Sequence, residues 1–244
     1  MSSPAPLQGK VVLITGAGSG LGAALCEVLC GAGAMTIAAD LRLEAAQAVA
    51  QRVRDARCTC TAVRMDVSDE RAVGVAMEEV VAQFGGLDIV VNNAGVDVTL
   101  PFDELAIGDW HRIIATNLTG PFLVSRHAVR SMRARGGGHL VNIASTAAKR
   151  AWPNASAYHA SKWGLLGLSH ALHAELRGQG IKVSAVIAGG MRTSFLLDRF
   201  PDIDLATLQD PRNVAHAVLN LLLMPPETVI PELLVLPVRE TSWP

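Results

Sequence analysis

Short apolar runs alternate along this chain with longer segments in which apolar residues recur at helical spacing. The run at 10–15 is rich in β-branched residues and too short for a helix, so it predicts a strand buried on both faces. Similar runs predict strands at 34–39, 58–65, 87–91, 139–144, 181–187 and 232–236. Helices are predicted at 23–30, 43–56, 68–84, 103–110, 111–135, 155–179 and 211–223, with Pro121 as a kink or local boundary.

This alternation of strand and helix is typical of βαβ units with right-handed crossovers in a parallel sheet. We therefore predict an α/β fold, a single Rossmann-type, doubly wound domain of about seven parallel strands flanked by helices on both faces. The domain spans 1–244, with a core at 7–237, a short substrate loop at about 193–210 and a C-terminal tail at 238–244. Ligands bind at the carboxyl ends of such strands, and the polar motifs fall there.

A glycine-rich turn, TGAGSGLG at 15–22, follows the first predicted strand and precedes the first helix. Gly16, Gly20 and Gly22 would let the backbone approach a pyrophosphate, and the helix N-terminus would offer free N–H groups to its charge. An ordinary glycine turn has the same composition. The strand before it and the helix after it favour dinucleotide binding.

Carboxylates end the second and third predicted strands. Asp40 is placed to accept hydrogen bonds from an adenosine ribose diol and would repel a 2′-phosphate, which favours NAD over NADP. Arg42 argues the other way, because a guanidinium can partner a phosphate. Asp66 lies where an adenine amino group could be met, and a turn or cap role fits it equally.

A hydroxyl, a phenol and an amine follow one another at Ser145, Tyr158 and Lys162. If Tyr158 lies on a helix, Lys162 is one turn away on the same face. A phenol has a reference pKa of roughly 10, and a nearby ammonium favours the phenolate and lowers that pKa. Such a tyrosine can exchange a proton with an alcohol or carbonyl oxygen. Taken alone, the pattern also fits a solvated helix face.

The composition argues against nucleic-acid, membrane and metal partners. Hydrophobic residues make up 50% of the chain and charged residues 18%, with a net charge of −1 and no basic stripe, so no nucleic acid is expected. The apolar runs are too short to span a membrane and the N-terminal segment lacks a signal-peptide core, so we expect a cytoplasmic protein without a membrane partner. Cys26, Cys30, Cys58 and Cys60 lack zinc-knuckle spacing and are interpreted as reduced, mostly buried thiols, so no metal is predicted.

Taken together, separated motifs resemble those of the classical short-chain dehydrogenase/reductase family, over nearly the whole chain from 10 to about 236. The motifs are the glycine turn, Asp66 with Val67, NNAG at 92–95, Asn117, Ser145, YHASK at 158–162 and AGGMRT at 188–193. Two departures stand out: Ala188 replaces a usual proline, and the segment between Thr193 and Pro211 is too short for a large lid.

The resemblance implies a role for each matched residue. Tyr158 would be the acid/base, Lys162 would lower its pKa and hold the nicotinamide ribose, and Ser145 would polarise the reacting oxygen. Asn117 would support a water-linked proton path to Lys162, and Thr193 would contact the nicotinamide carboxamide or the phosphates. Cofactor contacts are implied for Gly16, Ser19, Gly20, Leu21, Gly22, Asp40, Asp66, Val67, Asn93, Ala94, Gly95, Tyr158, Lys162, Gly189 and Thr193.

The expected function is an NAD(P)(H)-dependent oxidoreductase that interconverts a small-molecule secondary alcohol and a ketone by hydride transfer, with NAD preferred. The alternatives are an NADP-dependent carbonyl reductase, including an oxoacyl type, and a non-catalytic dinucleotide-sensing protein of the same fold. Trp152, Phe195, Leu196, Leu197 and Phe200 are candidates for substrate contacts, although a short helix packed on the body explains the last four equally well. The resemblance also implies a homodimer or homotetramer built on the helices that carry Asn117 and Tyr158.

Overall fold

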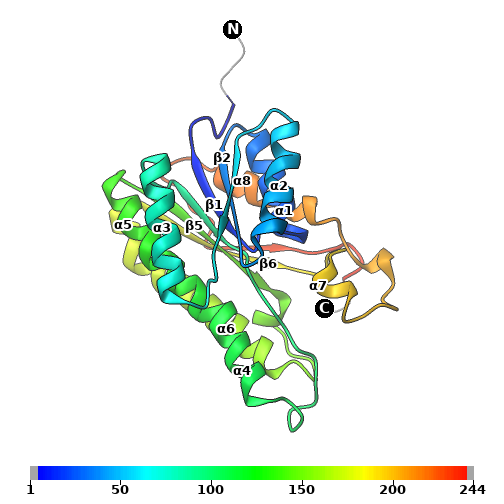
Figure 1. Ribbon diagram of the computed structural model, residues 1–244. Coiled ribbons are helices and arrows are strands. Elements are labelled where there is room, and N and C mark those ends of the chain that lie inside the picture. The colour runs from blue at the N-terminus through cyan, green and yellow to red at the C-terminus, as the bar shows by residue number, and fades with distance from the viewer. Residues whose placement is uncertain (1–4, 241–244) are drawn as a thin grey trace.

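A parallel sheet lies between two layers of helices in the computed structural model, which describes residues 5–240 (Figure 1). Within those residues the strands form one seven-stranded sheet in the order β3-β2-β1-β4-β5-β6-β7, with every neighbouring pair parallel. The predicted single-domain Rossmann-type fold is confirmed. The strands are β1 (Val11–Thr15), β2 (Met35–Asp40), β3 (Cys60–Arg64), β4 (Ile89–Asn92), β5 (Gly138–Ser145), β6 (Ile181–Ala188) and β7 (Glu232–Val235).

The helices cover both faces of the sheet (Figure 1). One layer holds α1 (Gly20–Gly31), α2 (Leu43–Asp55) and α8 (Pro211–Leu222), and the other holds α3 (Glu70–Phe84), α5 (Gly120–Ala134) and α6 (Ser156–Leu176). Alternate residues of β1 enter the two layers, Val12 and Ile14 on one side and Val11 and Leu13 on the other. This double burial is why the strand is apolar from Val11 to Ile14.

The direction of strand addition reverses between β1 and β4. From β1 the chain builds outward through β2 to β3, and it then returns to place β4 on the other side of β1. The crevice outside the carboxyl ends of such a pair is the usual ligand site of an open α/β sheet. The glycine turn after β1 and the NNAG sequence at the end of β4 therefore meet at this point.

The predicted long helix at 111–135 is wrong in one respect, because a π-helical turn at Ala115–Thr119 interrupts it. A helix α4 (Ile107–Ile114) precedes that turn and includes the second half of the predicted short helix at 103–110, while α5 follows the turn. Pro121, in the first turn of α5, has no N–H to donate to the carbonyl of Asn117 four residues earlier. The regular α-helical ladder cannot continue there, and wider turns of this kind often occur at functional sites.

Other boundaries shift by a few residues. Helix α1 begins at Gly20, inside the glycine turn, and the helix predicted to Gln179 ends as α6 at Leu176 before a 3₁₀ turn. The segment at 193–210 holds one short helix, α7 (Ser194–Leu197), and a 3₁₀ turn. Of the predicted tail at 238–244, residues 241–244 lie outside the described residues.

Candidate active site

The crevice at the carboxyl ends of the strands opens into a cavity of about 810 Å³. Most of the residues predicted to bind cofactor or substrate line this single cavity, although they come from the ends of six strands, β1 to β6, and from two helices. Of the residues predicted for catalysis or cofactor binding, Gly22 and Asn117 do not line it. The predicted residues that line it are Gly16, Ser19, Gly20, Leu21, Asp40, Asp66, Val67, Asn93, Ala94, Gly95, Ser145, Tyr158, Lys162, Gly189 and Thr193.

The glycine turn is packed too tightly for side chains. A Cβ atom on Gly16, whose φ is +63°, would lie 2.7 Å from the Cα of Ala94, and one on Gly22 would lie 2.2 Å from the carbonyl oxygen of Gly16. Ser19 is the N-cap residue of α1, but its side chain accepts no hydrogen bond from the first turn of the helix. The Ser19 side chain therefore does not occupy the N–H groups of that turn. A long helix beginning on a compressed glycine turn fits a pyrophosphate.

Asp40 connects the end of β2 to this turn. Its Oδ2 accepts a hydrogen bond from Gly18 N at 2.9 Å, and its Oδ1 accepts one from Arg42 N at 3.0 Å. The side chain of Arg42 is 70% exposed, with Nε 3.9 Å from the carboxylate. Both residues on which the NAD-or-NADP question depends therefore lie at the same end of the cavity. Asp66 accepts from Ser68 N at 2.9 Å, so it does hold a turn while lining the cavity.

Asn93 ties the end of β4 to the glycine turn. Its Nδ2 donates to the carbonyls of Thr15 at 2.9 Å and Gly16 at 3.1 Å. In return, Thr15 Oγ1 accepts from the backbone N–H groups of Asn93 and Ala94. The predicted amide thus fixes the shape of the cofactor cradle from behind.

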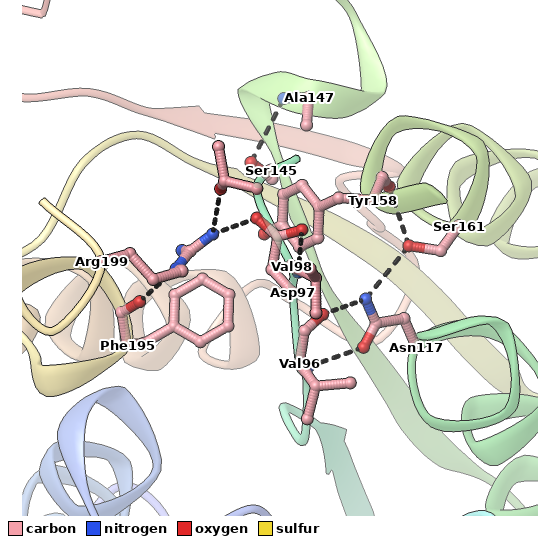
Figure 2. A network of polar contacts seen from close by, with 11 residues as sticks. Val96, Asp97, Val98, Asn117, Ser145, Ala147, Tyr158, Ser161, Phe195 and Arg199 are labelled. Carbon is pink, nitrogen blue, oxygen red and sulfur yellow. Dashed lines mark hydrogen bonds and ion pairs between the residues drawn. The ribbon is translucent and has the colours of Figure 1, made fainter. Parts of the chain in front are cut away.

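Ser145, Tyr158 and Lys162 come together as predicted at the other end of the cavity. Ser145 is the last residue of β5, while Tyr158 and Lys162 lie one turn apart on α6 and are both buried. Lys162 Nζ donates to the carbonyl of Ile143 at 2.8 Å and lies 5.6 Å from the centre of the Tyr158 ring. Figure 2 shows Ser145 beside the phenol.

The pKa of Tyr158 differs from the sequence-based expectation that Lys162 lowers it. Burial raises the pKa of Tyr158 to about 12, although a hydrogen bond with Ser145 lowers it. Burial also lowers the pKa of Lys162 to about 8. Desolvation of the buried phenol therefore sets the direction of its pKa shift, in place of the lowering expected from the Lys162 ammonium. The protonated phenol is the form that can donate a proton to a carbonyl oxygen.

Asn117 stands in the π-helical turn with its side-chain amide fully engaged. Its Oδ1 accepts from Val96 N at 2.8 Å, and its Nδ2 donates to Val96 O at 2.8 Å and to Ser161 Oγ at 3.1 Å (Figure 2). Ser161 lies between Tyr158 and Lys162 on α6. The Asn117 side chain therefore holds the segment after β4 against the catalytic helix.

The loop between Ser145 and Tyr158 is held by a histidine. The ring of His159 is buried, with Nδ1 3.0 Å from Ala147 O and Nε2 accepting from Trp152 N at 3.1 Å. These partners require a neutral ring with its proton on Nδ1, since Nε2 must accept. His159 therefore positions Trp152, which lines the cavity as expected.

A charged pair in the cavity wall was not predicted from the sequence. Asp97, shortly after β4, forms an ion pair with Arg199, just beyond α7 (Figure 2). Phe195, Leu196 and Phe200 line the same wall as expected, whereas Leu197 does not. A lone aspartate between two valines, immediately after a motif at a strand end, was a signal for Asp97. Nothing local in the sequence distinguishes Arg199.

The compressed glycine turn, the helix N-terminus and the carboxylate at the end of β2 all fit a dinucleotide. A family model described as short chain dehydrogenase matches residues 10–203, and the chain belongs to this family. A relative, the D-threitol dehydrogenase of Mycolicibacterium smegmatis, is 42% identical over 180 residues, which cover 74% of this chain and 69% of that protein.

Solved structures give the same result. The 3-ketoacyl-(acyl-carrier-protein) reductase of Brucella melitensis, complexed with NADH, has a TM-score of 0.86 and 31% identity, covering 96% of this chain and 99% of that one. A metagenomic short-chain oxidoreductase in complex with NADP has a TM-score of 0.85 and 31% identity, covering 96% and 99%. A nicotinamide dinucleotide is therefore the supported cofactor class.

Two further features are absent from residues 5–240. They contain no group of three or more His, Cys, Asp or Glu side chains that could hold a metal ion. They also contain no helix that is both long and apolar enough to cross a membrane.

Proposed function

We propose that this chain is an NAD(H)-dependent oxidoreductase that interconverts a secondary alcohol and a ketone. The observation that carries the proposal is the convergence of Ser145, Tyr158 and Lys162 on the cavity that also contains the glycine cradle. A reacting carbon placed between these two ends would have a hydride partner on one side and a proton partner on the other. The family supplies the class of reaction and the cavity supplies the groups.

Each group has a chemical task in this proposal. Tyr158 donates its phenolic proton to the carbonyl oxygen in reduction and takes it back in oxidation. Ser145 donates a hydrogen bond to the same oxygen, and Lys162 holds positive charge near the phenol and offers donors to a ribose. The bound nicotinamide supplies the hydride donor or acceptor. Asn117 keeps α6 and the segment after β4 in place, and it is proposed to support the proton path to Lys162.

NAD is proposed over NADP because Asp40 faces the glycine turn with both oxygens on backbone N–H groups, where a 2′-phosphate would meet a carboxylate. An NADP-dependent carbonyl reductase remains the second candidate, supported by the exposed Arg42 and by the NADP held in a similar structure. Binding of NADH and NADPH to wild type and to Asp40→Ala separates them. Tighter NADPH binding by the wild type would favour the second candidate.

We further propose a homodimer or homotetramer that uses α5 and α6. Each helix presents an exposed aromatic side chain, Phe122 at 46% and Trp163 at 52% exposure. Exposed aromatic groups on neighbouring helices are common at subunit interfaces. Light scattering of wild type and Trp163→Glu measures this directly, and a wild-type monomer would contradict it.

The decisive variant for the reaction is Tyr158→Phe. With a panel of alcohols and ketones followed through nicotinamide absorbance, turnover should fall by about three orders of magnitude or more because the proton partner is lost. NADH binding, measured by fluorescence, should survive. Near-normal turnover would overturn the mechanism. A wild type that binds NADH and never changes its absorbance with any panel member would favour a dinucleotide-sensing protein.

A further inference from the structure

The ion pair between Asp97 and Arg199 is built into the substrate end of the cavity. The Asp97 side chain is 4% exposed and that of Arg199 is 21% exposed, so both charges are largely removed from water. The partners lie 102 residues apart in the chain, on the segments that follow β4 and α7. Figure 2 shows the guanidinium reaching across to the carboxylate beside Tyr158.

Further contacts fix both side chains. Arg199 Nε donates to the carbonyl of Phe195 at 2.8 Å, and its guanidinium lies 4.4 Å from the centre of the Phe195 ring. The other oxygen of Asp97 accepts from Val98 N at 2.7 Å. The guanidinium is thus held by a carboxylate, a carbonyl and an aromatic face, an arrangement that fits a permanent wall of the cavity.

The pair lies close to the reacting groups. The Phe195 ring that supports Arg199 is 6.0 Å from the Tyr158 ring, and Asp97 and Arg199 act electrostatically on the Tyr158 phenol in opposite directions. Near this end the wall also holds the apolar side chains of Trp152, Phe200 and Ile203, and Thr99 Oγ1 lies 3.5 Å from Arg199 Nη1. A substrate whose oxygen meets Tyr158 must therefore lie beside the pair.

The other arginines of the cavity wall are paired elsewhere. Arg42 lies beside Asp40 at the cofactor end, and Arg112 pairs with Asp109 at 3.0 Å. Lys162 is buried and donates to a backbone carbonyl. Glu240 adds a further carboxylate to the wall, with Oε2 accepting from Gly190 N at 3.0 Å. Arg199 is therefore the cation best placed to receive an anionic substrate group, and Asp97 already neutralises it.

We propose that Asp97 and Arg199 determine specificity, by restricting the site to uncharged alcohols or ketones with an apolar body and rejecting substrates that carry a carboxylate. This rests on the proposed oxidoreductase function. A substrate carboxylate would either lie against Asp97, with like-charge repulsion, or displace Asp97 from Arg199 and leave a buried charge without its partner. An uncharged substrate leaves the pair intact.

The test compares matched substrates that differ in charge. Hydroxy acids and their methyl esters, such as 4-hydroxycyclohexanecarboxylate and 3-hydroxybutyrate with their esters, are assayed with NAD⁺, and kcat/KM is compared within each pair. Wild type should prefer the ester by at least about tenfold. A wild type that prefers the acids would overturn the proposal, because Arg199 would then be exchanging Asp97 for the substrate.

The variant Asp97→Asn keeps the shape of the side chain and frees the charge of Arg199. It should move the acid-to-ester ratio toward the acid by at least about tenfold. In Asp97→Asn with Arg199→Gln the gain should disappear, since no cation remains. Asp103→Asn, an exposed site outside the cavity wall with the same change in net charge, should leave the ratio as in wild type.

A ratio that stays within about twofold in Asp97→Asn would refute the proposal while leaving the oxidoreductase function standing. Absence of turnover with every acid, every ester and the wider alcohol panel would instead refute the proposed function itself. If Asp97→Asn fails to fold, the wild-type ratio decides alone, with ester preference supporting the pair as a filter and acid preference overturning it.

Discussion

The glycine turn offers a test in which two substitutions of the same kind, in the same helix, should have opposite outcomes. Gly22 and Gly31 both lie in α1, near its first and at its last residue. A Cβ on Gly22 would lie 2.2 Å from the carbonyl oxygen of Gly16, 2.8 Å from the Cα of Ala17 and 2.8 Å from Nδ2 of Asn93. A Cβ on Gly31 would have no atom within 4 Å.

The magnitude follows from what must move. Two of the three neighbours of the Gly22 position are backbone atoms, and the third is an amide that already donates to Thr15 and Gly16. Overpacking of this kind costs roughly 2–3 kcal/mol. For a chain of this length that corresponds to a fall in Tm of roughly 4–12 °C. The displaced turn should also weaken NADH binding by at least about tenfold, since it carries the cradle.

Gly31→Ala is the matched control. Alanine favours the helical state over glycine by up to about 1 kcal/mol, so this variant should keep or slightly raise the Tm. Its NADH affinity should equal that of wild type. The assays are thermal unfolding and fluorescence titration with NADH. If Gly22→Ala binds NADH and melts like wild type, the tight packing described for the turn is wrong.

The remaining predictions concern charge and position. Tyr158 is the only tyrosine in the chain, so ultraviolet titration reports on it alone. With its pKa raised to about 12 by burial, no more than about a tenth of it should be ionised at roughly pH 11 while the protein stays folded. A titration midpoint near pH 10 would contradict this burial. The pKa of Lys162 is lowered from 10.5 to about 8, so between these pH values the folded state binds fewer protons than the unfolded state. The stability of wild type relative to Lys162→Met should therefore rise with pH across that window. A difference in Tm that stays constant with pH would count against this prediction. His139 is buried, and burial lowers its pKa from 6.5 to about 3. Its contribution to stability should be complete above pH 6.5 and be lost as the pH falls toward 3. The stability of His139→Asn should therefore fall less steeply with decreasing pH than that of wild type. His159→Phe leaves Trp152 N and Ala147 O without their hydrogen-bond partner, at a cost in stability of roughly 1–3 kcal/mol each. Because His159 positions Trp152 in the cavity wall, kcat/KM should fall while NADH affinity stays the same. A fall in NADH affinity alone would refute this positioning role.

The parallel sheet could be predicted from the sequence because its central strands are buried on both faces. The run at 10–15 has no polar face because β1 packs against both helix layers. A short apolar run of this kind predicts a strand that is buried on both faces. The motifs then fell at strand ends, where parallel topology brings them together. Asp40, Asn93 and Ser145 could be placed in one site without any knowledge of side-chain contacts.

What could not be predicted depends on contacts that are distant in the chain or on burial. Arg199 is defined by a partner 102 residues away, and no local pattern encodes that distance. The pKa of Tyr158 was expected to fall because Lys162 is near in sequence, whereas the depth of burial decides the direction. Pro121 marked a boundary, but its missing N–H predicts only a break in the helical ladder and not the wider turn found at Ala115–Thr119.

The central claim is that Tyr158 exchanges a proton while a hydride passes between nicotinamide and the substrate carbon. The most direct measurement uses NADH labelled with deuterium at the transferring position of nicotinamide C4 and the ketone that the panel shows to be reduced fastest. Mass spectrometry of the wild-type reaction should find one deuterium on the new carbinol carbon. Tyr158→Phe, although still binding NADH, should form this product at least about a thousandfold more slowly. An unlabelled alcohol from wild type, or labelled product formed equally fast by Tyr158→Phe, would contradict the account.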